Sequence, residues 1–423
     1  MEKRVSMLLL LILLCTLSNG VYGKSKARIP RFEINRRLKL LNKSAVKTIK
    51  SEDGDIIDCV DIYKQPAFDH PALKNHTIQM QPSFIPAVET SNGKLENSRP
   101  VVSQLWKRRG SCPKGTIPIR RIRRQDLLRA NSLDEFGRKS PEHFERTNKT
   151  ANQDRIMHLN NTNGPILSPT PENRSTAILL TYGFNFIGAS GEINVWNPHV
   201  EKPPEFSTAQ IWLKNGEVDS FESVEAGWIV SFSLYADTRT RFFIYWTADG
   251  YKNTGCFDLT CYAFVQTSKE ITIGGALEPG SSTHQQQYVL PLNIFMDPST
   301  SNWWLMYHNI TVGYWPGSLF YLLKHSATSV EWGGQVYSFN VRKSPHTKTA
   351  MGSGYNAEQL YGLACFIGHP RILDYSKSYK YPTFVGIWKD EYNCYSAINY
   401  KEGNGNSEPL FFFGGPGQSP RCP

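Results

Sequence analysis

Short runs of apolar and aromatic residues alternate with turn residues through most of the second half of the chain. From about residue 176 onward, runs rich in Val, Ile, Phe, Tyr, Trp and Thr are separated by Gly, Asn, Asp and Pro. Such spacing is typical of β-strands joined by short turns, and stretches with a helical period are few. Residues 176–423 are therefore predicted to form an all-β domain, an antiparallel β-sandwich resembling a jelly roll.

The first half of the chain has a different pattern, in three parts. An apolar run within residues 7–17 follows two basic residues, which predicts a signal peptide over residues 1–23. Residues 24–140 begin with a basic amphipathic stretch, predicted as a short helix, and continue with strand-like runs and a second helix start. They are predicted to form a small α+β segment. Residues 141–175 are polar and lack apolar periodicity, which predicts a solvated linker.

The charge is divided unequally along the chain. The net charge of the whole protein is +10, but residues 1–165 carry +14 and residues 166–423 carry −4. A nucleic-acid-binding protein would need its cations on the larger folded domain, so nucleic acid is excluded as a partner. After the signal peptide, no segment approaches the roughly 20 consecutive apolar residues of a membrane span. The mature protein is therefore predicted to be soluble and exported, with no membrane association after removal of the signal peptide.

Cysteines and glycosylation motifs agree with export from the cell. One of the eight cysteines, Cys15, lies in the signal peptide, and the odd number that remains leaves at least one thiol unpaired within the chain. Cys256 and Cys261 are spaced for a disulfide at a hairpin tip, and no set of His and Cys suggests zinc, so neither a metal nor a cofactor is predicted. An extracellular or vacuolar protein is expected. The Asn-x-Ser/Thr acceptor sites are Asn42, Asn75, Asn148, Asn160, Asn173 and Asn309.

Two glutamates occupy similar positions in two predicted strands. Side chains alternate between the faces of a strand, so Glu225 and Glu331 each project from a polar face whose opposite face is apolar. Each has a glycine two residues later, Gly227 and Gly333, which leaves space beside the carboxylate for another backbone. The pattern by itself is more typical of ordinary solvent-facing strand residues. The alternative interpretation is that the two carboxylates line the floor of a substrate groove.

If the two carboxylates converge, their chemistry follows. Two like charges at short range cannot both ionise easily, so the pKa of one carboxyl group rises and the other group stays ionised. The ionised group takes a proton from water as general base, and the protonated group polarises a carbonyl or protonates a leaving amine. Activity is then expected at acidic pH. Glycosidases also use paired carboxylates, so the pair alone does not identify the bond that is cleaved.

Ordered motifs along the chain indicate a family. The first half contains the run from Gly54 to Tyr63, the run from Gln65 to Pro71 and the run from Cys112 to Arg121; the second contains 193–198, 206–212, 225–228, 245–247, 254–261, 313–316, 330–334 and 346–354. With these motifs the chain resembles the neprosin family, in which an activation peptide precedes a catalytic domain. The resemblance implies a β-sandwich similar to that of glutamic peptidases. It also implies cleavage after proline at acidic pH, with Glu225 and Glu331 as the catalytic pair.

The resemblance also implies cysteine pairings. These are Cys256–Cys261 and Cys394–Cys422, while Cys59–Cys112 would staple the segment before the catalytic domain, leaving Cys365 as the odd thiol. Where many relatives have Gly-Gly-Glu after the second glutamate, this chain has Gln335.

The expected function is a secreted glutamic endopeptidase made as a zymogen and acting on proline-containing polypeptides. Residues 24–140, the basic prosegment, are expected to inhibit the catalytic domain of residues 176–423 by lying over an acidic groove, and acid would weaken that attraction. One alternative is a non-catalytic extracellular protein that binds cell-wall glycans or Pro-rich proteins in an aromatic groove. A glycosidase is a third possibility, which the resemblance disfavours.

Overall fold

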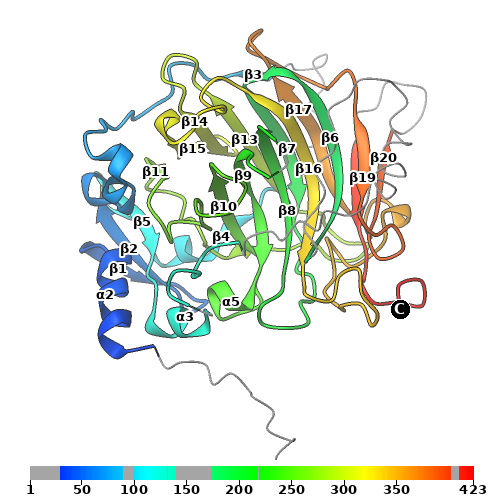
Figure 1. Ribbon diagram of the computed structural model, residues 1–423, viewed down its shortest axis with the longest axis horizontal. Helices are drawn as coiled ribbons and strands as arrows, with labels where there is room; N and C mark the ends of the chain where they lie inside the picture. The colour runs from blue at the N-terminus through cyan, green and yellow to red at the C-terminus, as the bar shows by residue number, and fades with distance from the viewer. Residues whose placement is uncertain (1–28, 89–98, 131, 140–172, 218, 402–408) are drawn as a thin grey trace, which may run out of the picture.

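The computed structural model describes residues 29–88, 99–130, 132–139, 173–217, 219–401 and 409–423. The predicted signal peptide, most of the predicted linker and the acceptor sites Asn148 and Asn160 lie outside this part of the chain. Two antiparallel β-sheets dominate the described residues and form the predicted sandwich (Figure 1).

The first sheet has six strands in the order β10-β9-β8-β16-β6-β19, with every neighbouring pair antiparallel. Its strands are β6 (Arg174–Phe186), β8 (Phe206–Asn215), β9 (Glu222–Val230), β10 (Arg241–Thr247), β16 (Ala327–Tyr337) and β19 (Gly386–Lys389).

The second sheet has ten strands, and its main path runs β11-β15-β14-β13-β7-β17-β18-β3. The strands on this path are β7 (Gly188–Asn194), β11 (Val265–Gln266), β13 (Val289–Met296), β14 (Trp303–Tyr307), β15 (Ile310–Trp315), β17 (Cys365–Leu373), β18 (Ser378–Lys380) and β3 (Ala87–Val88). β21 (Leu410–Gly414) pairs with β17, and β20 (Ser396–Tyr400) pairs with β21.

The sandwich core lies between the two sheets. Alternate residues of β8, β9 and β16 enter one large apolar cluster with the inner residues of β7, β13 and β14. Trp228 and Trp332, which strand alternation placed opposite the two glutamates, are fully buried in this cluster. Their indole N–H groups donate to the carbonyl oxygens of Asn194 and Ser190 across the core, both at 2.9 Å. These polar bonds fix the orientation of the strands that carry the glutamates.

The prosegment forms a small α+β unit against one side of the sandwich, coloured blue to cyan in Figure 1. It contains α2 (Arg31–Leu41), α3 (Arg124–Arg129) and a three-stranded sheet of β1 (Ala45–Lys50), β2 (Ile56–Asp61) and β5 (Thr116–Arg120). It also adds β3 to β18 in parallel, and β4 (Ser103–Gln104) to β12 (Leu277–Glu278). The prosegment is therefore attached to residues of the sandwich domain by backbone hydrogen bonds at two places, β3 with β18 and β4 with β12.

Two sequence-based boundaries differ from the structure. The basic stretch predicted as one helix is helical only over Arg31–Leu41 and continues as the strand Ala45–Lys50, because Ala-Val-Lys-Thr-Ile-Lys has a two-residue period and pairs with β2. The sandwich begins at Arg174, inside the predicted linker, because Arg174 and Ser175 pair with the end of β16. The second helix, α3, begins close to the residues that predicted it.

The cysteines lie as the resemblance implied. Cys59–Cys112, Cys256–Cys261 and Cys394–Cys422 are disulfides, and Cys365 is a buried thiol in β17. The Cys59–Cys112 bond lies within the prosegment, so the described residues show no disulfide between the prosegment and the sandwich.

The described glycosylation sites have different surroundings. Asn75 and Asn309 are exposed, whereas Asn42 and Asn173 are partly buried. The side-chain amide of Asn42 donates to the carbonyl oxygen of Ile122 and accepts from its N–H, so it already joins α2 to the chain before α3. Glycosylation stays a prediction at all of them. Across the described ranges, no helix has the length and apolar content needed to cross a membrane.

Candidate active site

The two predicted glutamates lie in one row across the six-stranded sheet. Tyr245, Glu225, Trp212, Glu331 and Leu180 are directly opposite one another on successive strands β10, β9, β8, β16 and β6. Residues directly opposite in a sheet project from the same face. With strands about 4.8 Å apart, the α-carbons of the two glutamates are roughly 10 Å apart, and Trp212 lies between them. The strands thus bring two carboxylates, 106 positions apart in the sequence, onto one surface.

The glycines beside the glutamates have the role that the sequence suggested. A β-carbon at Gly227 would lie 2.0 Å from the carbonyl oxygen of Ala209 in β8, and one at Gly333 would lie 2.3 Å from that of Ala177 in β6. Any larger residue would therefore push the neighbouring strand away from its register. Both motifs also read Ser-Val-Glu-x-Gly, and in each the serine hydroxyl donates to its own glutamate: Ser223 to Glu225 at 2.8 Å, and Ser329 to Glu331 at 3.3 Å.

Glu225 is fully buried and surrounded by hydrogen-bond donors. Besides Ser223, it accepts from the side-chain amide of Gln210 at 2.7 Å and from the hydroxyl of Tyr251. Its strongest partner is the ammonium group of Lys139, 2.5 Å from Oε2. Lys139 is also buried, and its backbone N–H donates to the hydroxyl of Tyr245 at 3.1 Å.

Lys139 belongs to the prosegment and is the last described residue of that segment. Its ammonium group lies 4.4 Å from the ring centre of Tyr245 and 4.5 Å from that of Tyr251, so the cation is enclosed by aromatic faces as well as by the carboxylate. The prosegment therefore inserts one buried cation directly onto one of the two glutamates. The sequence had predicted a diffuse attraction between a basic segment and an acidic groove.

Burial and charge oppose each other at this pair. Burial raises the pKa of Glu225, but the charge and hydrogen bond of Lys139, the hydroxyl of Tyr251 and the charge of Lys214 bring it below the ordinary value. Burial also lowers the pKa of Lys139 to about 8, despite the attraction of Glu225. Between the lowered pKa of Glu225 and about pH 8 both groups are charged, and each is the principal partner of the other.

Glu331 has a more open environment. Its side chain retains 11% of its exposure, and its Oε2 lies 2.6 Å from the ammonium group of Lys214, a residue of β8 in the same domain. Tyr182 of β6 is directly opposite Ser329 of β16, and burial together with the charge of Glu331 raises the pKa of its phenol. Thus each glutamate has one lysine, but only one of the two lysines comes from the prosegment.

A cavity of about 610 Å³ lies next to Lys139, between the prosegment and the sandwich. Phe206 and Tyr337 stack in its wall with ring centres 5.2 Å apart and planes inclined by 9°. Two prolines and further aromatic residues complete the sandwich side of this wall: Pro203, Pro204, Phe232, Phe257 and Phe339. These residues, and not Trp228 or Trp332, offer aromatic surface to the cavity next to Lys139.

Sequence reasoning missed several groups of the site. Nothing in the sequence distinguished Lys139 from other residues of a basic segment, or Lys214 from other strand lysines. The repeated Ser-Val-Glu was visible and would have identified the two serines. Glu222, at the start of β9, accepts three backbone N–H groups from Tyr321, Leu322 and Leu323 at 2.7–2.9 Å, and so anchors the loop before β16 to β9.

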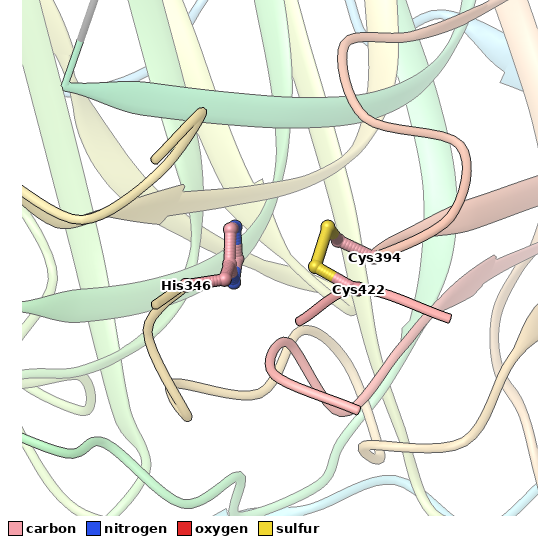
Figure 2. Close-up of side chains that lie close together, drawn as sticks. All are labelled: His346, Cys394 and Cys422. Atoms are coloured by element: carbon pink, nitrogen blue, oxygen red, sulfur yellow. A yellow bond between two sulfur atoms is a disulfide. The ribbon is translucent and has the colours of Figure 1, made fainter. Parts of the chain in front are cut away.

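A second cluster of potential ligand atoms lies elsewhere. Figure 2 shows His346 beside the Cys394–Cys422 disulfide, and their ligand atoms lie within 4.8 Å of one another. The two sulfur atoms are bonded to each other and offer no thiolate to a metal. The imidazole makes its own contacts, with the carbonyl oxygen of Thr347 at 2.8 Å and with Glu391 at 3.3 Å. This cluster is therefore interpreted as packing around a disulfide.

Comparison with known proteins identifies the two parts of the chain. Residues 203–416 match the family described as Neprosin, and residues 48–163 match the Neprosin activation peptide. Among solved structures, the chain is similar to scytalido-glutamic peptidase with a transition state analog inhibitor (12% identity, TM-score 0.31, 57% of this chain and 97% of that chain). It is also similar to SCP-B, a member of the eqolisin family of peptidases in a complex with a tripeptide (11% identity, TM-score 0.29, 57% and 96%). An activation peptide before a catalytic domain is the organisation of a peptidase made as a zymogen, and the chain belongs to the neprosin family.

Proposed function

We propose that the protein is a secreted glutamic endopeptidase that cleaves after proline at acidic pH, with Glu225 and Glu331 as its acid/base pair. The observation that carries the proposal is the shared row of Glu225, Trp212 and Glu331 across adjacent strands. Two carboxylates on one face, each with its own hydroxyl donor, supply the general acid and general base of amide hydrolysis. The peptidase family of the chain favours peptide bonds over glycosidic bonds.

The proposed proline preference rests on the aromatic wall of the cavity next to Lys139. Once the prosegment has left, the stacked rings of Phe206 and Tyr337 would face the space from which Lys139 has departed. A proline ring is compact and apolar and docks against aromatic-lined surfaces.

The prosegment is proposed to inhibit the enzyme through Lys139. A carboxylate that is ionised, buried and bonded to an ammonium group can neither donate a proton nor approach a substrate. Removal of the prosegment would leave Glu225 without this partner and open the adjoining cavity. The signal-like N-terminus supports the secretory route for this zymogen, extracellular or vacuolar.

The test is cleavage of a quenched peptide containing one proline by the processed enzyme at acidic pH. Glu225→Gln and Glu331→Gln keep the side-chain size and remove the charge, and each is expected to lower kcat/KM by about 10²–10⁴-fold. Glu217→Gln, an exposed carboxylate in the connection between β8 and β9, is the matched control and should retain activity. A peptide with alanine in place of proline should be cleaved more slowly.

Two results would overturn the proposal. Full activity in both glutamine variants would exclude the pair as catalytic. Absence of peptide cleavage together with binding of a polysaccharide or a Pro-rich protein would instead favour the non-catalytic function.

A further inference from the structure

Lys214 is placed between the two glutamates by the central strand of the sheet. It lies two residues after Trp212 and projects from the same face of β8, directly opposite Ser223 of β9 and Ser329 of β16. These are the serines whose hydroxyls donate to Glu225 and Glu331. The ammonium group bonds Glu331 at 2.6 Å and its charge also lowers the pKa of Glu225.

The surroundings of Lys214 hold its ammonium group in place. Its Nζ lies 5.7 Å from the ring centre of Trp212 and 5.6 Å from that of Phe221, so two aromatic rings flank the cation. The next residue, Asn215, donates to the carbonyl oxygen of Ser326 at 2.7 Å and joins the end of β8 to the loop that leads into β16. The strand that carries the lysine and the strand that carries Glu331 are thus fixed to each other on both sides of the ion pair.

Several charged or titratable groups face Glu331 and Glu225 from the packed elements. They are Lys214 from β8, Tyr182 and Arg174 from β6, Tyr245 from β10, Tyr251 after β10, and Lys139 from the prosegment. Among the described residues, Lys214 is the cation that an ion pair joins to Glu331, and Lys139 is the one so joined to Glu225. Removal of the prosegment takes away Lys139 and leaves Lys214.

We propose that Lys214 is a positioning residue of the active site, a resident cation that keeps Glu331 ionised in the processed enzyme and so makes Glu331 the general base and Glu225 the general acid. The proposal rests on the catalytic pair of the proposed function and assigns a role to each member. The physical reason is the asymmetry of the two environments. Removal of Lys139 takes away the ammonium group that forms an ion pair with Glu225, whereas Glu331 keeps Lys214 at 2.6 Å, and an adjacent cation favours the ionised form of a carboxyl group.

The reaction then balances as follows. The oxygen of a water molecule forms a bond to the carbonyl carbon of the substrate while Glu331 takes one proton from that water. The proton of Glu225 passes to the nitrogen of the scissile bond, the carbon–nitrogen bond breaks, and the nitrogen leaves with its electron pair as an amine. The products are a carboxylic acid and an amine. One proton returns from Glu331 to Glu225 through solvent to restore the starting state.

The experiment measures kcat/KM against pH for the processed enzyme and its variants on the quenched proline peptide. Lys214→Met keeps the length of the stem and removes the charge. It is expected to move the acid limb of the profile upward, because loss of an adjacent cation disfavours the ionised form of a carboxyl group. Lys214→Arg should return the limb toward the wild-type position. Lys214→Gln provides a second uncharged variant if the methionine variant does not fold.

A matched control is available in the other sheet. Lys380 forms an ion pair of 2.5 Å with Asp374 on the surface near β18, so Lys380→Met removes a similar pair without touching the site. Its pH profile should match that of the wild type.

The outcomes separate the two proposals. An unmoved acid limb in Lys214→Met, whether activity is retained or lost equally at all pH values, overturns the role of Lys214 while the catalytic pair stands. Wild-type activity that survives Glu331→Gln, or a wild-type enzyme that cleaves no peptide, overturns both.

Discussion

The surroundings of Glu225 and those of Glu331 differ although the two residues share a sheet face, a row and a Ser-Val-Glu motif. The prosegment provides the cation for Glu225, and the pair is fully buried. The catalytic domain itself provides the cation for Glu331, and this pair remains partly open. The prosegment thus changes the charge environment of Glu225 and leaves the partner of Glu331 in place. Activation is therefore expected to change the chemistry of Glu225 most.

The largest effect is expected from breaking the buried pair in the zymogen. Lys139→Met leaves the carboxylate of Glu225 buried without its cation, which typically costs about 3–5 kcal/mol, so the unfolding midpoint of the proprotein should fall clearly. Lys214→Met breaks the half-open pair and should cost roughly 1 kcal/mol. Chemical unfolding followed by tryptophan fluorescence measures both. Adding Glu225→Gln to Lys139→Met should recover most of the loss, because no buried charge then remains unpaired.

Equal losses from Lys139→Met and Lys214→Met would contradict the difference between the two environments. Lys139→Arg serves as the control for charge, since it keeps a cation at the same position.

The next largest effect is expected on the release of the prosegment. After the linker has been cleaved, the pH determines whether the prosegment dissociates from the catalytic domain. The pKa of Glu225 is lowered from its ordinary value of 4.5 while the prosegment is bound. Its contribution to prosegment binding is therefore fully present above pH 4.5 and is lost as the pH falls through the lowered pKa. The pKa of Asp297 is also lowered, against its burial, by donors from Ser83 and Gln79 of the prosegment. Release should thus take up protons, and each proton weakens the attachment about tenfold per pH unit.

Size-exclusion chromatography of the cut protein, from about pH 6 to about pH 3, measures this release. Asp297→Asn should make the release less steep with pH. A prosegment that stays bound equally at all these pH values would exclude the carboxylates as the switch.

The smallest effect distinguishes the two serines. Ser223 donates to the buried Glu225 at 2.8 Å, and Ser329 donates to the more open Glu331 at 3.3 Å. Ser223→Ala should destabilise the zymogen by about 1.5–3 kcal/mol, the range for a hydrogen bond to a charged group, and Ser329→Ala by less than about 1 kcal/mol. Unfolding of both variants under one condition tests the order. A larger loss from Ser329→Ala would reverse the ranking of the two environments.

The sequence determined the all-β sandwich, the preceding prosegment and the faces of the two glutamate strands. It could do so because strand alternation is local: Trp228 and Trp332 had to project away from Glu225 and Glu331, and both are in the core. The resemblance to the family predicted the cysteine pairs, because the family motifs can be recognised from their order along the chain. The end of the first helix and the start of β6 were misplaced, because pairing with distant strands decided them.

Only the tertiary structure decided which cation meets which carboxylate. Lys139 and Glu225 are 86 positions apart, and Lys214 and Glu331 are 117 positions apart. Neither lysine differs in its local sequence from lysines that remain in solvent. Their partners follow from strand order, which puts β8 between the two glutamates, and from the docking of the prosegment, which carries Lys139 into the sheet face. Ion pairing depends on distance and burial in space, and neither quantity is a property of a short stretch of sequence.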